Sequence, residues 1–359
     1  MSSEFYDCTG ILATPDKNGD DPELYMVVSR GRGLGKTYSF TRHLLNTFRD
    51  TGGKFVLFCR YGKELGSIAN GQFKGMLEIE MDGYWMEEKQ RMHGVYSDVS
   101  LCHMEFNDDG ESQVHREHCG YVIPLNAADS VKKISSAFTD SVHAYFDEFQ
   151  PENSRTYVPD EVEKFKSIHT SIARGGGKSR RYYPVYMSSN AVTMGNPYFL
   201  AMGLHRQIQG DTKKYRGDGF VYQRTENAGK AAEADTSPMS RAMPHLKSSQ
   251  FSDEGWFMDD STAVCRPEKS WGRSMYLATI IDGETSYGLR WYPEVMLHHL
   301  GHRVDESCPD RVRLRVDGNV NLPVLKNSSA GHTIRSGIMD GSMRFQSQSA
   351  KSVALEFML

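Results

Sequence analysis

The stretch RGRGLGKT at residues 30–37 decides the fold class of this chain. It follows an apolar run, LYMVVS at 24–29, and precedes a segment at 38–50 whose apolar residues recur at helical spacing. A second apolar run, FVLFCR at 55–60, comes after a pair of glycines. Strand, glycine loop, helix and strand in this order predict the opening of an α/β nucleotide-binding domain.

The glycine loop has the composition of a phosphate-binding loop. Backbone N–H groups at a helix start, together with the helix dipole, attract phosphate. Lys36 would reach the β- and γ-phosphates of a nucleotide, and Thr37 would bind Mg²⁺. Arg30 stands where the GxxxxGK[ST] pattern has its first glycine, so the next glycine is expected to make the turn. The loop therefore predicts ATP and Mg²⁺ as cofactors. Four residues would surround the phosphates with their backbone: Gly31, Gly33, Leu34 and Gly35.

Two polar clusters follow later apolar runs. Asp147 and Glu148 come directly after VHAYF at 142–146, and Asn190 ends YPVYMSSN at 183–190. Asp147 would hold Mg²⁺ through water, and Glu148 would polarise the attacking water. Acidic pairs of this kind also cap helices, and an asparagine here could belong to an ordinary strand-ending turn. The phosphate loop favours the catalytic interpretation of the acids, and the Asn190 amide could sense the γ-phosphate.

Two arginines are candidates for stabilising transition-state charge. Arg32 lies inside the phosphate loop and would act within its own subunit. Arg174 ends an expected helix that begins at Pro159, beside a glycine triplet from which it could reach a neighbouring subunit. A solvated basic loop or a nucleic-acid contact is the alternative for Arg174.

The composition is that of a globular protein. The 359 residues predict about two domains, and a net charge of −4 excludes a histone-like blanket of positive charge. No apolar run approaches the ~18 residues of a membrane span, and the mean hydropathy is −0.55. Six cysteines without a CxxC pair, and a start without a secretory pattern, favour a reducing cytoplasm.

A change in composition indicates where domains meet. Residues 226–250 are rich in small polar residues, and two prolines interrupt any helix there. Short β-rich runs follow from about 256, with Asp282 and Gly283 as a hairpin turn, and the end is expected to be helical at least from Ser349. We expect a nucleotide-binding domain at 1–222, a linker domain at 223–255 and a third domain at 256–359.

A hairpin at 107–110 would bring cysteines and histidines together. Zinc needs four ligands in a tetrahedral array, which such a hairpin could supply. We favour an exposed polar hairpin, because the spacing matches no established zinc finger or ribbon. The residues concerned are Cys102, His103, His115, His118 and Cys119.

Five stretches resemble the genome-packaging ATPases of phi29-like phages, the equivalents of a large terminase subunit. They are RGLGKTYSF, FVLFCRYGKEL, YFDEFQPENSRTYVPDEV, MSSNAVTMGNPYFL and IMDGSMRFQSQSAKSVALEF. The resemblance implies an ASCE-type, RecA-like P-loop ATPase domain, a small linker domain and a C-terminal RNase H-like α+β domain that has lost nuclease activity. It also implies a homopentameric ring at the portal vertex, which drives double-stranded DNA into a preformed capsid in the host cytoplasm. Some relatives use a packaging RNA, and the sequence leaves its use here open.

The resemblance also assigns roles to single residues. The lid lysine falls one position from the family's place, at Lys63, and the loop after Arg174 is longer here. The other carried-over residues are the phosphate-loop pair Lys36 and Thr37, the acids Asp147 and Glu148, the coupling residue Asn190 and the trans-acting Arg174.

The expected function is therefore ATP-driven packaging of double-stranded DNA. A P-loop helicase or DNA-remodelling ATPase would share the same chemistry, and only the resemblance separates them. A non-catalytic, nucleotide-gated portal scaffold is disfavoured by Glu148, since a pure switch needs no water-activating carboxylate. We expect no nuclease activity. Asp282 is placed in a turn, whereas two-metal cleavage needs convergent carboxylates, which the spacing of Asp305, Asp310 and Asp340 does not suggest.

Overall fold

The structure is a computed structural model and divides into two compact units, Met1–Ala191 with Thr212–Ser252, and Val192–Asp211 with Asp253–Leu359. The expected linker at 223–255 lies outside the described residues from position 226 onward, so the expected domain boundaries stay a prediction. The described residues are 6–29, 33–106, 111–151, 157–175, 177, 179–192, 196–208, 212–225, 265–282, 285–313, 325, 328–340, 342–347, 350, 351, 353 and 354.

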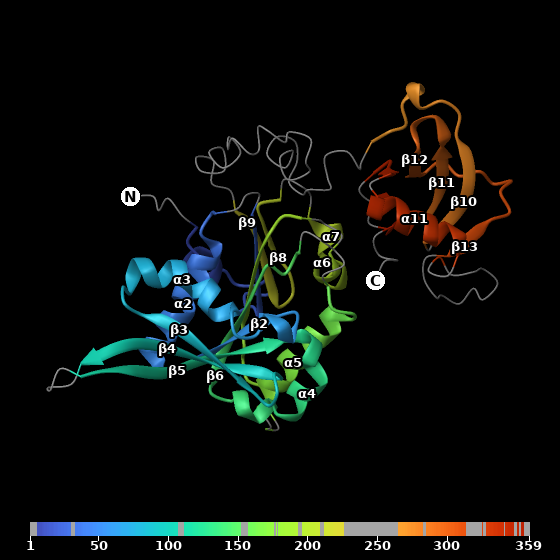
Figure 1. The fold of residues 1–359 in the computed structure, drawn as a ribbon. Helices are drawn as coiled ribbons and strands as arrows, with labels where there is room; N and C mark the ends of the chain where they lie inside the picture. The colour runs from blue at the N-terminus through green and yellow to red at the C-terminus, as the bar shows by residue number, and fades with distance from the viewer. Residues whose placement is uncertain are drawn as a thin grey trace. The chain divides into compact units, whose positions relative to one another are not determined.

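One mixed sheet forms the centre of the first unit (Figure 1). Its described strands are β1 (Leu24–Ser29), β2 (Lys54–Cys59), β3 (Trp85–Arg91), β4 (Tyr96–Phe106), β5 (Ser112–Pro124), β6 (Ser141–Asp147), β7 (Val185–Asn190), β8 (Lys214–Arg216) and β9 (Phe220–Thr225). They lie in the order β3-β4-β5-β2-β6-β7-β1-β9-β8. The six strands from β5 to β9 in this order run parallel, and the others pair antiparallel at the two edges.

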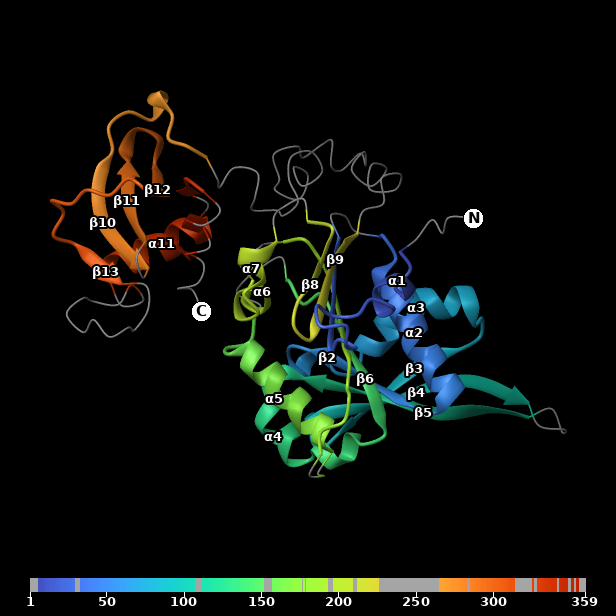
Figure 2. The same cartoon turned by 180° about the vertical axis from the view of Figure 1, so that it is seen from behind.

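Helices cover both faces of this sheet (Figures 1 and 2). α2 (Lys36–Thr51) and α3 (Ile68–Glu80) lie on one face, and α5 (Glu161–Arg174) lies on the other. Successive strand residues point to opposite faces, so Tyr145 packs against Phe40 of α2, while Phe146 stacks on Phe165 of α5. Both faces are therefore apolar, as a parallel sheet covered on both sides requires. Two shorter helices are α1 (Thr9–Leu12) and α4 (Ala128–Lys133).

The expected α/β opening is confirmed. The runs at 24–29, 55–60, 142–146 and 183–190 overlap β1, β2, β6 and β7 to within one or two residues at each end, and α2 covers the expected helix. The expected start of α5 at Pro159 is wrong by two residues. Asp160 has a left-handed backbone, with φ of 53°, so the helix begins at Glu161.

The cysteines and histidines of the β4–β5 hairpin do not gather into a metal site. Cys102 and His103 are consecutive on β4 and therefore point to opposite faces. Burial raises the pKa of the Cys102 thiol to about 11 and that of Cys119 to about 12, which disfavours thiolate ligands. His103 pairs across the strands with His115, and both contact Glu105. The described residues hold no group of three such side chains placed to bind a metal ion.

The second unit contains a smaller mixed sheet with the order β13-β10-β11-β12-β14 in its described part. Its elements are α6 (Pro197–Ala201), α7 (Leu204–Gln207), β10 (Met275–Asp282), β11 (Thr285–Tyr292), β12 (Leu297–Gly301), β13 (Arg311–Arg313), α11 (Ser329–Asp340) and β14 (Met343–Phe345). The expected hairpin is confirmed as β10 and β11, although Asp282 ends the strand and pairs with Thr285 rather than lying in the turn. Near the end, the described residues Ala350, Lys351, Val353 and Ala354 are helical. No helix among the described residues is long and apolar enough to cross a membrane.

Candidate active site

Three parallel strands bring the candidate residues to one edge of the first sheet. β7 lies between β1 and β6, so the carboxyl ends of these strands are neighbours. Ser29 pairs with Asn190, and Asp147 pairs with Ser188. Ligands of open α/β sheets bind at this edge, where loops leave the strands. The register therefore places the acids and the asparagine beside the glycine loop that follows β1.

The described part of the glycine loop, residues 33–35, turns through left-handed glycines into the start of a helix. Gly33 and Gly35 have φ of 74° and 82°, in the left-handed region that glycine adopts without penalty. Gly35 is the residue before α2, and Lys36 and Thr37 begin the helix. Their N–H groups lie at its positive end, which attracts anions. Gly31 and Arg32, expected to take part, lie outside the described residues.

Lys36 lies buried between two strand ends. Its Nζ donates to the Ser29 hydroxyl and, at 3.4 Å, to the Asn190 Oδ1. Burial lowers the pKa of Lys36 to about 8, and the nearby Asp147 and Glu148 carboxylates oppose this shift. A buried cation with two neutral partners is poised to accept a polyanionic ligand.

Asp147 is held by two hydroxyl groups. Thr37 donates to its Oδ2 at 2.7 Å, and Ser188 donates to its Oδ1 at 2.5 Å. Ser188 in turn pairs with the buried hydroxyl of Tyr145 at 2.8 Å. Thr37 and Asp147, the two expected magnesium ligands, therefore lie in direct contact.

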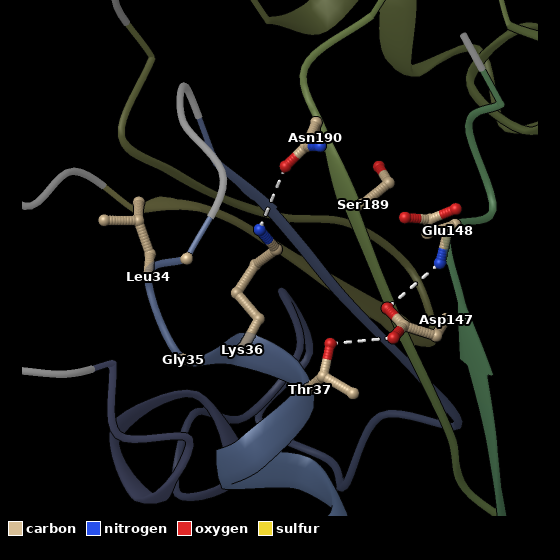
Figure 3. A pocket seen from close by; sticks show the side chains of 9 residues that line it. Leu34, Gly35, Lys36, Thr37, Asp147, Glu148, Ser189 and Asn190 are labelled. Carbon is tan, nitrogen blue, oxygen red and sulfur yellow. Dashed lines mark hydrogen bonds between the residues drawn. The ribbon is translucent and has the colours of Figure 1, made fainter. Parts of the chain in front are cut away.

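Glu148 follows Asp147 with an unusual backbone. Its φ is 51°, a left-handed conformation that is rare for residues other than glycine. Its N–H donates to the Asp147 Oδ1 at 3.0 Å. This turn carries Glu148 out of the strand and into the lining of the cavity (Figure 3).

These side chains surround one cavity of about 420 Å³. Lys36 and Thr37 lie on one side of it and face the acids and the end of β7 (Figure 3). The Ser189 hydroxyl is buried in the same wall without a hydrogen-bond partner among the described residues. A buried, unpaired hydroxyl there can receive a hydrogen bond from a ligand or donate one to it. The lining residues are Gly33, Leu34, Gly35, Lys36, Thr37, Asp147, Glu148, Ser189 and Asn190.

The residues present fit a magnesium nucleotide. Mg²⁺ is commonly held by one or two protein oxygens together with substrate phosphates and water. The Thr37 hydroxyl and the Asp147 carboxylate, hydrogen-bonded beside Lys36, form such a partial ligand set.

Two expected residues are not brought into this cavity. Lys63 is exposed on a short 3₁₀ helix (Gly62–Glu64), with its Nζ 5.5 Å from the centre of the Tyr61 ring. Arg174 is exposed at the end of α5, where the next residue, Gly175, lies against Thr139, just before β6 begins. Asp147 is at the other end of β6, a seven-residue strand that spans roughly 20 Å. Arg174 therefore cannot reach the pocket of its own chain.

Two partners in the site were missed by sequence reasoning. Ser29 holds Lys36, and Ser188 holds Asp147, although each reads as an ordinary polar strand end. Only the register of three strands, which are far apart in the sequence, reveals these roles.

These features define a P-loop nucleotide-binding protein. They are a left-handed glycine turn, a lysine and a threonine at a helix start, and two acids at the end of a nearby parallel strand. Comparisons with known proteins then narrow the class. Residues 10–359 match the model of the Podovirus DNA encapsidation protein (Gp16) family, and the chain belongs to this family.

Relatives agree with this assignment. The chain is 24% identical over 351 residues to a DNA packaging protein of Bacillus phage phi29, with 96% of each chain covered. It is 24% identical over 330 residues to a DNA packaging protein of Bacillus phage B103, with 90% of this chain and 93% of the relative covered. It also shares its fold with a chain of the bacteriophage phi29 viral genome packaging motor assembly, with a TM-score of 0.54, 21% identity and 99% of each chain covered.

Proposed function

We propose that this chain is an ATPase that drives double-stranded DNA into a preformed phage capsid through the portal. The observation that carries the proposal is the placement of Glu148 in the wall of a phosphate-loop cavity, in a chain of the DNA encapsidation family. A carboxylate at that place can polarise water for attack on a γ-phosphate.

Five of the lining residues have a part in this chemistry. Lys36 compensates phosphate charge, and Thr37 and Asp147 would hold Mg²⁺, which supplies further charge compensation when bound. Glu148 orients water and accepts its proton. Asn190 contacts Lys36 at 3.4 Å, so a nucleotide that attracts the ammonium group changes the environment of Asn190. That contact is a direct route from phosphate occupancy to the end of β7.

Two alternatives are weaker. A P-loop helicase or DNA-remodelling ATPase would use the same pocket, but family membership favours packaging. A nucleotide-gated portal scaffold without turnover would not need Glu148, whose left-handed backbone carries it into the cavity.

We infer that several copies form a ring, most simply a pentamer, at the portal vertex in the host cytoplasm. A relative with the same fold was solved within a viral genome packaging motor assembly, which supports assembly with portal and DNA. The position of Arg174, exposed and far from its own pocket, supports action on a neighbour's pocket. Lys63 is the proposed lid lysine, and a packaging RNA is a further proposed partner.

The domain assignment is likewise a proposal. The first unit, with β7 between the phosphate-loop strand and the acidic strand, supports an ASCE-type, RecA-like ATPase domain at 1–222. The meander β10-β11-β12, with β13 parallel to β10, supports an RNase H-like domain at 256–359. Asp282 ends β10 rather than lying in the turn, so the proposed absence of nuclease activity is supported instead by the middle of β10, which carries Thr279 and Ile280 rather than a carboxylate. Residues 223–255 remain the proposed linker domain.

A steady-state ATPase assay with and without double-stranded DNA tests the function. Glu148→Gln keeps the size of the side chain but cannot accept a proton, so we expect nucleotide binding to persist while turnover falls about 10²-fold or more. Asp147→Asn should instead weaken binding of the magnesium nucleotide. Wild-type turnover by Glu148→Gln would show that another residue is the base.

A further inference from the structure

Arg60 is a buried cation directly behind the catalytic turn. It follows β2 and is only 6% exposed, although no sequence pattern gives it a role. Its Nη1 donates to the carbonyl of Glu148 at 2.9 Å, and its Nη2 donates to the carbonyl of Phe149 at 2.7 Å. Its Nε donates to the Glu161 carboxylate at 3.1 Å. One planar group therefore holds two consecutive carbonyls of the chain that carries the proposed base.

The backbone at Glu148 needs such support. A left-handed conformation is unfavourable by roughly 1–2 kcal/mol for a residue with a Cβ. It persists only where surrounding contacts determine it. The Glu148 N–H is fixed by Asp147, and its carbonyl is fixed by Arg60. These two bonds hold both ends of the residue, so they set the direction in which its side chain leaves.

Arg60 itself is held in place on several sides. The Glu161 side chain is 1% exposed and balances its charge, and it also accepts the Val158 N–H at 2.8 Å. The rings of Phe146 and Tyr157 lie 5.1 Å and 5.2 Å from the guanidinium carbon. An arginine fixed in this way is a rigid support, because its fork of donors is planar and always charged.

We propose that Arg60 is a positioning residue for ATP hydrolysis, which fixes the left-handed turn at Glu148 and so aims its carboxylate at the attacking water. The inference rests on the proposed function, in which Glu148 is the base. Arg60 does not line the nucleotide cavity, so its loss affects the chemical step and not nucleotide binding.

The first test is Arg60→Lys in the full chain. Lysine keeps the charge beside Glu161 but offers a compact ammonium group that cannot hold both carbonyls and the carboxylate in one plane. We expect kcat for DNA-stimulated ATP hydrolysis to fall by roughly 10–10²-fold, since small misplacements of a reacting group have effects of this size. The Kd for magnesium ATP should stay at the wild-type value. An unchanged kcat, or a Kd that rises as much as kcat falls, would overturn the proposal.

A second variant tests whether a loss of activity in Arg60→Lys is caused by misfolding. Arg60→Met with Glu161→Met removes both buried charges together, which cores often tolerate well. It should fold, bind magnesium ATP and show the same loss of kcat. Gly120→Ala is the control for a general loss of stability, because a Cβ at this position of the same sheet, away from the cavity, would lie 2.5 Å from the Phe55 ring and is expected to destabilise the fold. Its kcat should match the wild type at temperatures where it is folded.

A double-mutant cycle then separates this inference from the proposed function. If Arg60 acts through Glu148, Arg60→Lys should reduce single-turnover hydrolysis in the wild type but have no further effect in Glu148→Gln. Equal reductions in both backgrounds would mean that Arg60 acts independently, which contradicts the proposal. Full activity of Glu148→Gln alone would instead remove the proposed base. Normal kcat for the Arg60 variants with an inactive Glu148→Gln would overturn only the positioning role.

Discussion

The ionisation of Lys36 should affect how tightly the chain binds a nucleotide. Its pKa of about 8 results from burial, which outweighs the opposing effect of the nearby Asp147 and Glu148 carboxylates; among the described residues its hydrogen-bond partners are the neutral Ser29 hydroxyl and Asn190 amide oxygen. Phosphate groups favour the charged form, so a bound nucleotide should raise this pKa again. Binding above pH 8 therefore requires uptake of a proton.

This linkage gives a pH dependence with a definite sign. Nucleotide affinity should be nearly constant below pH 8 and fall by up to about tenfold per pH unit above it, because the free chain then carries a neutral Lys36. Calorimetric titration with magnesium ATP at pH 7 to 9.5, in two buffers of different ionisation enthalpy, measures both affinity and proton uptake. Constant affinity without proton uptake over this range would show that Lys36 is already fully charged in the free chain.

Much of the site follows from local sequence signals. Lys36, Thr37, Asp147, Glu148 and Asn190 all line one cavity, as their positions after apolar runs predict. Their partners could not be found in that way. Ser188 on β7 acts on Asp147, and Arg60, the residue after β2, acts on the turn at Glu148, but no sequence pattern assigns either of them these partners.

At the scale of elements, α5 connects two functional positions. Its first residue, Glu161, is tied through Arg60 to the turn at Glu148, and its last residue is Arg174. A helix of 14 residues is about 21 Å long. A displacement of the turn could therefore be carried along α5 toward the exposed arginine.

Close pairing of β2 with β5 gives a stability prediction. A Cβ on Gly120 would lie 2.5 Å from the Phe55 ring and 2.7 Å from its carbonyl oxygen, so Gly120→Ala should destabilise the chain by about 1–3 kcal/mol. Gly75 is the matched control, since it is exposed within α3 and a Cβ there meets no atom within 4 Å. Gly75→Ala should stabilise by about 0.5–1 kcal/mol. Urea unfolding measures the free energy of unfolding of both variants. Equal free energies for Gly120→Ala and Gly75→Ala would contradict the β2–β5 register.

The strands of the first sheet that the sequence predicted are the strands with apolar sequences. β1, β2, β6 and β7 are buried on both faces over most of their length, with Val142 of β6 exposed, and their sequences are largely apolar. β3 was missed because its sequence, WMEEKQR, is largely polar, as suits a strand at the sheet edge. The order of the strands, including the place of β7 between β1 and β6, depends on contacts that no local pattern encodes.

For the whole molecule, the ring mechanism depends on Arg174. If it completes a neighbour's pocket, Arg174→Ala should bind ATP nearly as well as the wild type but fail to hydrolyse it. Mixing Arg174→Ala with Glu148→Gln should restore some ATPase activity, because a pocket with intact Glu148 can then face a neighbour with intact Arg174. If the mixture stays as inactive as both parents, with mixed rings verified, the arginine does not act in trans and Arg32 becomes the candidate.

In the proposed function, ATP hydrolysis in this pocket moves DNA. The most direct measurement is packaging of double-stranded DNA into purified empty capsids, read as DNA protected from nuclease. The wild-type chain with ATP should protect full-length DNA, whereas Glu148→Gln should bind ATP and assemble on the capsid but protect none. Packaging by Glu148→Gln at the wild-type rate would show that hydrolysis through Glu148 does not drive DNA into the capsid.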